Sequence, residues 1–150
     1  MKAINIGIDL DETLINNYED RTGYSYIKWD IKPCAAKYLP LLYKMGFNFH
    51  LITARQFSEK NNVNSIIQYI ENKLNVKFQS ITLTNGSPKG FYARQKNCFC
   101  MIDDNTDFLY DCSKHNFLPI LFGNNNNPPK NYTFGPSWHY VYNYLLQLLQ

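Results

Sequence analysis

The sequence lacks several patterns that would identify whole classes of protein. No apolar run approaches the roughly 20 residues of a membrane-spanning helix. Cys34, Cys98, Cys100 and Cys112 form no CxxC pair, and no Cys/His spacing matches a zinc site. Lysine and arginine form no cluster typical of a nucleic-acid surface. Asp9 interrupts the first apolar stretch too early for a signal peptide. We therefore expect a soluble, intracellular, cytoplasmic protein with no membrane partner.

The composition is that of an ordinary globular domain. Of the 150 residues, 45% are hydrophobic and 18% are charged. This length suits one domain with a sizeable core, and no repeat or change of composition divides the chain. A net charge of +3 is compatible with a phosphorylated partner but does not require one. We therefore predict a single domain over residues 1–150, and a homo-oligomer is compatible with it.

Short apolar runs alternate with segments of helical spacing. We predict strands at residues 3–10, 47–53, 80–83, 98–102 and 118–122, and helices at 33–45, 61–74, 89–94, 107–115 and 138–149. Residues 12–31 and 123–135 read as loops, and Pro40 predicts a kink or a helix in two pieces. The alternation predicts an α/β fold of three layers, α/β/α, with a mostly parallel sheet of about five strands.

Polar and charged side chains follow three of these strands where each strand ends. They are Asp9 and Asp11 after the first strand, Thr53 and Arg55 after the second, Asp103 and Asp104 after the fourth, and Lys89 between the last two groups. Ligands of parallel sheets bind outside the carboxyl ends of the strands. We therefore expect these side chains to form one site.

The chemistry of this site points to a cation. Asp9 and Asp11 are two residues apart, and Asp103 would lie near them, so the three carboxylates would repel one another. A divalent ion removes this repulsion, and a set of oxygen ligands favours Mg²⁺. Magnesium usually shares its coordination shell with a phosphate of the substrate. The pattern therefore favours a small phosphorylated substrate.

Three motifs resemble those of the haloacid dehalogenase (HAD)-like phosphohydrolase superfamily. "DLDET" at 9–13 is similar to the first motif, DxDx[TV], "LIT" at 51–53 to the second, and "IDDN" at 102–105 to the fourth, acidic motif. The resemblance spans nearly the whole chain. It implies a Rossmann-like fold, a Mg²⁺ cofactor and a phosphatase that hydrolyses phosphomonoesters through an aspartyl-phosphate intermediate.

A narrower resemblance favours a nucleotide as the substrate. "HLITAR", "MIDDN" and "PILFGNNNN" are similar to segments of small nucleotidase-type members related to 5'(3')-deoxyribonucleotidases, which include phage and viral proteins. This similarity implies a 5'-nucleotidase-like activity on nucleoside monophosphates, and it is compatible with a viral or phage source.

The resemblance also implies a role for each residue of the motifs. Asp9 would be the nucleophile, and Asp11 would protonate the leaving oxygen and then deprotonate the hydrolytic water. Mg²⁺ would be held by Asp9, the backbone carbonyl of Asp11 and Asp103, and Asp104 would bind it through water or orient the other ligands. Thr53 would bind the transferring phosphoryl oxygens.

Two further side chains keep alternatives open. A lysine would neutralise the phosphoryl charge; we favour Lys89 in "SPKG", and Lys96 is its rival. Arg55 either binds the substrate phosphate or base, or pairs with a carboxylate.

Residues 14–31 leave room for a short flap or miniature cap and not for a full helical cap. Aromatic side chains in this segment either pack or stack on a base; they are Tyr18, Tyr24, Tyr26 and Trp29. With a minimal cap or none, the alternative substrates are polynucleotide 3'-phosphate ends or other exposed phosphoesters. An alternative of another class is a non-catalytic phosphate-binding or interaction domain.

Overall fold

A computed structural model describes residues 4–19, 27–115, 117–123 and 132–149. Six strands form one sheet in the order β5-β4-β1-β6-β7-β8, and every neighbouring pair is parallel. The strands are β1 (Ile4–Ile8), β4 (Phe47–Thr53), β5 (Phe78–Leu83), β6 (Cys100–Asp103), β7 (Leu118–Phe122) and β8 (Thr133–Gly135). The predicted α/β fold with a parallel sheet is thus confirmed.

The strand order places β1 between β4 and β6. Ile8 of β1 pairs with Leu51 on one side and with Ile102 on the other. The carboxyl ends of these three strands therefore meet at one edge of the sheet. This register positions the residues that follow β1 beside the last residues of β4 and β6.

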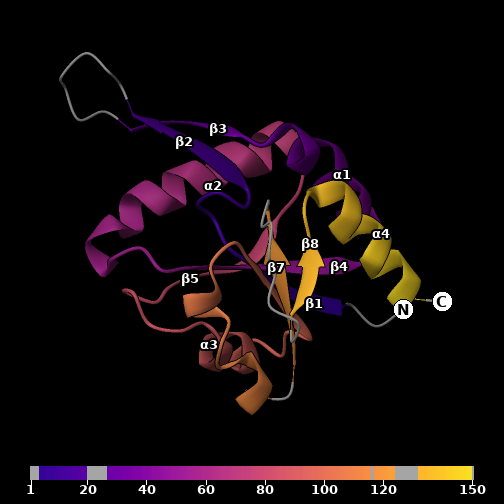
Figure 1. The fold of residues 1–150 in the computed structure, drawn as a ribbon. Helices are drawn as coiled ribbons and strands as arrows, with labels where there is room; N and C mark the ends of the chain where they lie inside the picture. Colours follow the sequence, from indigo (N-terminus) through magenta and orange to yellow (C-terminus); the bar gives the residue numbers. More distant parts are fainter. Residues whose placement is uncertain (1–3, 20–26, 116, 124–131, 150) are drawn as a thin grey trace.

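Helices cover both faces of the sheet (Figure 1). On one face lie α1 (Pro33–Lys44), α2 (Lys60–Leu74) and α4 (Trp138–Leu148), which pack over Ile6, Ile8 and the other large core residues. On the opposite face lies α3 (Gly90–Gln95), which packs over a smaller apolar cluster. The result is the three-layer arrangement that the alternating sequence predicts.

The predicted loop at residues 12–31 contains a β-hairpin instead. Its strands are β2 (Ile15–Glu19) and β3 (Ile27–Ile31), which pair antiparallel from Ile15–Ile31 to Glu19–Ile27. Ile15 is fully buried, whereas Asn16 and Asn17, which follow it, are both polar and partly exposed, so the sequence shows no regular alternation. Tyr24 and Tyr26 lie outside the described residues.

Three further expectations need correction. Helix α1 is one helix through Pro40 and not two pieces, and Leu39 and Leu42 on either side of Pro40 are buried in the core. The helix predicted at 107–115 is replaced by two 3₁₀ helices, η2 (Thr106–Phe108) and η3 (Cys112–His115). The loop predicted at 123–135 contains β8, a sixth strand of only three residues.

In the described part of the chain, no helix has the length and apolarity needed to cross a membrane.

Candidate active site

The chain turns sharply after β1 and carries two acids through the turn. The backbone N–H of Asp9 donates to the carbonyl of Ile102 at 2.9 Å, which ties the end of β1 to β6. The amides of Leu14 and Ile15 then both donate to the Leu10 carbonyl, and Glu12 has a left-handed φ of 60°. Asp9 stays buried below the turn, whereas Asp11 sits on it, about one-third exposed.

Asp9 belongs to a buried ion cluster with Lys89 and Asp103. The Lys89 ammonium lies 2.7 Å from Asp9 Oδ1 and 2.5 Å from Asp103 Oδ2, and its side chain is fully buried. The Thr13 hydroxyl donates to Asp9 Oδ2 at 3.1 Å. A buried cation is costly unless it is paired, so the two carboxylates account for the presence of Lys89 in the interior.

Contacts around the start of α3 hold Lys89 in this position. Its backbone N–H donates to the carbonyl of Phe108 at 3.0 Å, and Asp111 Oδ1 accepts the N–H of Gly90 at 2.9 Å. A Cβ atom at position 90 would lie 2.5 Å from Asp111 Oδ1, so the close approach requires glycine. Lys96 follows the last turn of α3. Burial lowers the pKa of His50, and the charge of Lys96 lowers it further. The structure therefore brings Lys89, and not Lys96, to Asp9.

Asp9, Asp103 and Asp104 each offer a carboxylate oxygen within a span of 4.8 Å. Burial is the largest cause that raises the pKa of Asp9 well above its usual value, and repulsion from Asp103 adds to it, while Lys89 opposes the rise. Burial, helped by repulsion from Asp104, raises the pKa of Asp103 to about 6 against the same opposition. Asp104 itself is exposed. The cluster therefore holds more negative charge than Lys89 neutralises.

This excess charge predicts an unusual dependence of stability on pH in the metal-free protein. Asp103 has an ordinary pKa of 3.8 and a pKa of about 6 in the folded chain, so protonation stabilises the fold. This contribution is fully present below pH 3.8 and is lost as the pH rises through 6, a change of up to about 3 kcal/mol. Urea unfolding in the presence of a chelator, from pH 4 to 7, measures it.

Asp103→Asn is the matched variant for this measurement. Its free energy of unfolding lacks the Asp103 contribution, so the wild-type protein should lose stability relative to the variant as the pH rises. If the difference in free energy of unfolding between the two proteins stays constant from pH 4 to 7, the raised pKa of Asp103 is contradicted.

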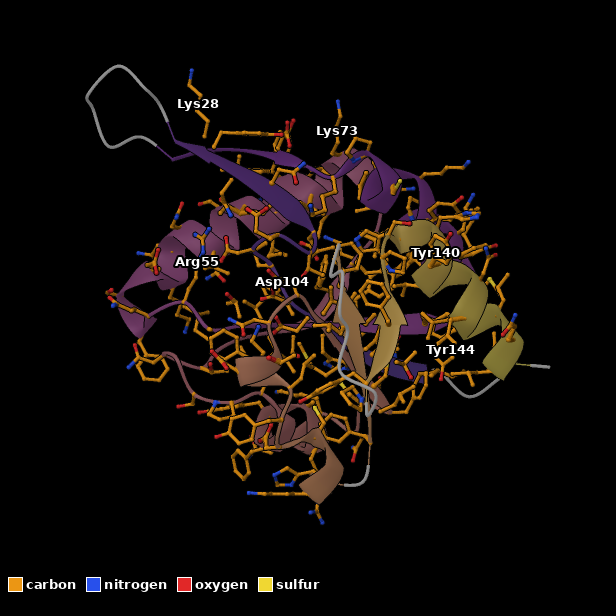
Figure 2. All side chains as sticks on the ribbon, in the orientation of Figure 1. Lys28, Arg55, Lys73, Asp104, Tyr140 and Tyr144 are labelled. Atoms are coloured by element: carbon orange, nitrogen blue, oxygen red, sulfur yellow. The ribbon has the colours of Figure 1, made fainter. Side chains whose placement is uncertain are left out.

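Asp11 has a different environment, because Arg55 holds it in two hydrogen bonds. Arg55 Nε donates to Asp11 Oδ2 at 2.9 Å, and a terminal guanidinium nitrogen lies 2.7 Å from Oδ1. Asn17 Nδ2 donates to Asp11 Oδ1 at 2.8 Å. Partial burial disfavours the charge of Asp11, but Arg55 and Asn17 outweigh it and lower the pKa below its usual value. Of the two expectations for Arg55, the structure shows the pair with a carboxylate. Figure 2 labels Arg55 beside α2 and the exposed Asp104 near the middle of the view.

Thr53 is the last residue of β4 and is fully buried. Its hydroxyl accepts the backbone N–H of Arg55 at 3.3 Å, and its carbonyl accepts that of Thr84 at 2.8 Å. These contacts fix the exit of β4, which lies next to the exit of β1 in the sheet. Thr53 therefore lies at the same sheet edge as the acids.

Sequence reasoning missed three residues that orient this cluster. Thr13 holds Asp9 and is the fifth residue of "DLDET", so the motif itself carried a signal for it. Asn17 contacts Asp11, and Asp111 clamps the backbone beside Lys89, yet no pattern in the sequence marks either residue.

The similarity of this chain to known proteins lies in its structure. No protein-family model matches the chain, and no curated protein matches it by sequence. Among solved structures, a D,D-heptose 1,7-bisphosphate phosphatase from B. bronchiseptica, complexed with magnesium and phosphate, is similar over 97% of this chain and 99% of that one (TM-score 0.71, 15% identity). A HAD-superfamily hydrolase from Ehrlichia chaffeensis is similar over 100% of both chains (TM-score 0.72, 15% identity).

A hypothetical protein from Xanthomonas campestris is also similar, over 80% of this chain and 64% of that one (TM-score 0.52, 16% identity). The fold of the chain is therefore that of HAD-superfamily hydrolases, as the three motifs predict.

Proposed function

We propose that the protein is a magnesium-dependent phosphomonoester hydrolase that forms an aspartyl-phosphate and acts on nucleoside monophosphates. The observation that carries the proposal is the meeting of Asp9 with Lys89, Asp103 and Asp104 at the carboxyl edge of the sheet. The phosphatase fold of the solved neighbours, one of which is complexed with magnesium and phosphate, supports the same chemistry.

The donor set of the cluster fits Mg²⁺. Three carboxylates within 4.8 Å supply the hard oxygen ligands that this ion prefers. Burial, with added repulsion from neighbouring carboxylates, raises the pKa values of Asp9 and Asp103, and a dication relieves this repulsion. Asp9 and Asp103 would hold the ion directly, with the backbone carbonyl of Asp11, and Asp104 would complete or orient the set. When bound, Mg²⁺ neutralises charge on the transferring phosphoryl group.

In the first step, a carboxylate oxygen of Asp9 attacks phosphorus, and the bond from phosphorus to the ester oxygen breaks. Thr13 and Lys89 hold Asp9 in one orientation through their contacts with its two oxygens. The proton of Asp11 in its carboxylic acid form passes to the leaving oxygen, and Asp11 becomes the carboxylate that Arg55 and Asn17 favour. Lys89 and Thr53 bind the phosphoryl oxygens, because this reaction depends mainly on positioning and charge.

In the second step, Asp11 accepts a proton from a water molecule, and the oxygen of that water attacks the phosphorus of the aspartyl-phosphate. The bond between Asp9 and phosphorus breaks, and phosphate leaves. Arg55 and Asn17 favour the carboxylate form of Asp11, which is the form that this step requires.

The nucleotide part of the proposal rests on "HLITAR" and "MIDDN", and it can be tested separately from the hydrolysis. We expect phosphate release from a panel of nucleoside monophosphates, sugar phosphates and 3'-phosphorylated oligonucleotides, with the monophosphates turned over fastest. Removal of Mg²⁺ with a chelator should abolish release, and added Mg²⁺ should restore it.

The panel also separates the alternatives. Faster turnover of 3'-phosphorylated oligonucleotides would replace the nucleotidase proposal with a polynucleotide phosphatase. If no ester in the panel is hydrolysed, the result favours the non-catalytic phosphate-binding or interaction domain.

A further inference from the structure

The proposed reaction places the leaving oxygen beside the carboxylate of Asp11. Asp11 lines a cavity of ≈ 380 Å³ between the β2–β3 hairpin and the start of α2. The hairpin contributes Asn17 and Trp29 to its wall, and the segment after β4 contributes Glu59 and Asn62. Figure 1 shows the hairpin lying over α2. A leaving group that meets Asp11 therefore enters this cavity.

We propose that this cavity binds the leaving group of the substrate, that this group is a neutral nucleoside, and that Trp29 determines the specificity by stacking on its base. The proposal rests on the proposed function, and it assigns the substrate-recognition site that the motifs leave open.

The register of the hairpin fixes Trp29 beside the acid. Asn17 and Trp29 are paired residues of β2 and β3, and directly paired residues of antiparallel strands have their side chains on the same face. Asn17 donates to Asp11 at 2.8 Å, so this face of the hairpin is the one turned toward Asp11. Trp29 consequently lies next to Asn17, the residue that contacts the proposed proton donor Asp11.

Contacts with α2 hold the indole of Trp29 in place. Its ring meets the ring of Tyr69 edge-on, with centroids 5.4 Å apart and planes at 85°. Trp29 is half-buried and packs against the main core, which leaves part of the indole on the cavity wall. A rigid aromatic surface of this kind binds a planar base at little cost in conformational entropy.

The charges around the cavity disfavour a second anionic group on the substrate. Arg55 supplies a positive charge to the cavity wall, and its side chain is 13% exposed. It makes two hydrogen bonds with Asp11 and lies 3.8 Å from Glu59. One positive charge thus faces two negative charges, so a second phosphate or carboxylate would be repelled. A larger cavity of ≈ 420 Å³ near Asp104 does contain a lysine, Lys32, but Asp11 is not part of its lining.

The polar groups of the cavity suit a nucleoside. The exposed amide of Asn62 both donates and accepts hydrogen bonds, as bases and sugars require. The nearby Asn17 directs its NH₂ group to Asp11 and Glu12, and its Oδ1 accepts no hydrogen bond from the described residues. A volume of ≈ 380 Å³ lies in the range of small-molecule sites.

A kinetic ratio tests the proposal. We compare kcat/KM for a nucleoside monophosphate with kcat/KM for glycerol 2-phosphate, which is small and not planar. Trp29→Leu should lower this ratio about tenfold through the loss of stacking, and Trp29→Phe should restore part of it. Lys28→Ala is the matched control, because Lys28 is the exposed neighbour of Trp29 on the other face of β3, and its ratio should stay at the wild-type value. An unchanged ratio in Trp29→Leu overturns the proposal.

A binding measurement separates this proposal from the proposed function. The chain has two tryptophans, and Trp138 is fully buried. In an Asp9→Asn background, a nucleoside without phosphate should quench the fluorescence of Trp29 with saturation, and the added change Trp29→Phe should remove the quenching. Quenching without hydrolysis of any ester would support the nucleoside site and contradict the proposed phosphatase activity. Hydrolysis with no quenching and no change of the kinetic ratio would support the phosphatase activity and contradict the nucleoside site.

Discussion

Asp9→Asn should lower phosphate release by roughly three orders of magnitude or more, which is the size of loss seen when a catalytic nucleophile is removed. An amide oxygen does not form the aspartyl-phosphate, whereas Thr13 and Lys89 can still bond the new side chain. Lys89 also keeps its contact with Asp103, so the variant should fold. Initial rates of phosphate release with saturating Mg²⁺ measure the effect.

The control for this variant is Asp107→Asn. Asp107 is exposed in η2, a few residues after the acidic motif, and its loss should leave the rate at the wild-type level. Equal turnover by Asp9→Asn and the wild-type protein would rule out the covalent mechanism. Trapping of phosphate on the wild-type chain, and not on the variant, would identify the intermediate directly.

Lys89→Met should have the largest effect on stability. Methionine keeps most of the volume of the side chain but leaves Asp9 and Asp103 buried without a counter-charge. Removing one partner of a buried ion pair typically costs about 3–5 kcal/mol, and we expect a loss of this size in the free energy of unfolding at neutral pH. The loss should shrink at low pH, because protonation removes the two stranded charges, and Mg²⁺ should recover part of it.

Lys96→Met is the matched control, because Lys96 is the rival lysine and ends the same helix. Its free energy of unfolding should change by no more than about 0.5 kcal/mol, as is usual for surface substitutions. Urea unfolding of the three proteins at pH 5 and pH 7, with and without Mg²⁺, gives the comparison. A Lys96→Met protein that loses more stability than Lys89→Met would contradict the ion cluster described above.

The sheet could be predicted from sequence because its strands are buried on both sides. β1, β4, β6 and β7 appear as apolar runs, and their predicted bounds are within two residues of the observed ones. The β2–β3 hairpin could not be predicted from the sequence, since it is packed on one face only and its polar and apolar residues alternate irregularly. Strand β8 is too short for any period, and its place depends on pairing with β7.

The acids of the site could be predicted because each follows a recognisable strand. The choice between Lys89 and Lys96 depends on where α3 begins, which Asp111 determines from a segment with no marked pattern. The choice of a partner for Arg55 is likewise a matter of side-chain geometry, since Asp11 and the substrate were both open to it. Contacts of this kind arise only from tertiary packing.

The hydrogen bond between Trp138 and Thr13 has a consequence for folding during synthesis. Trp138 begins α4, and its indole N–H donates at 2.7 Å to the carbonyl of Thr13, the residue that holds Asp9. The first and last parts of the fold thus meet in one turn, 125 residues apart. During synthesis the amino-terminal acids leave the ribosome long before their supporting helix. A nascent chain should therefore release no phosphate from a substrate until α4 has emerged from the ribosome and packed against the sheet.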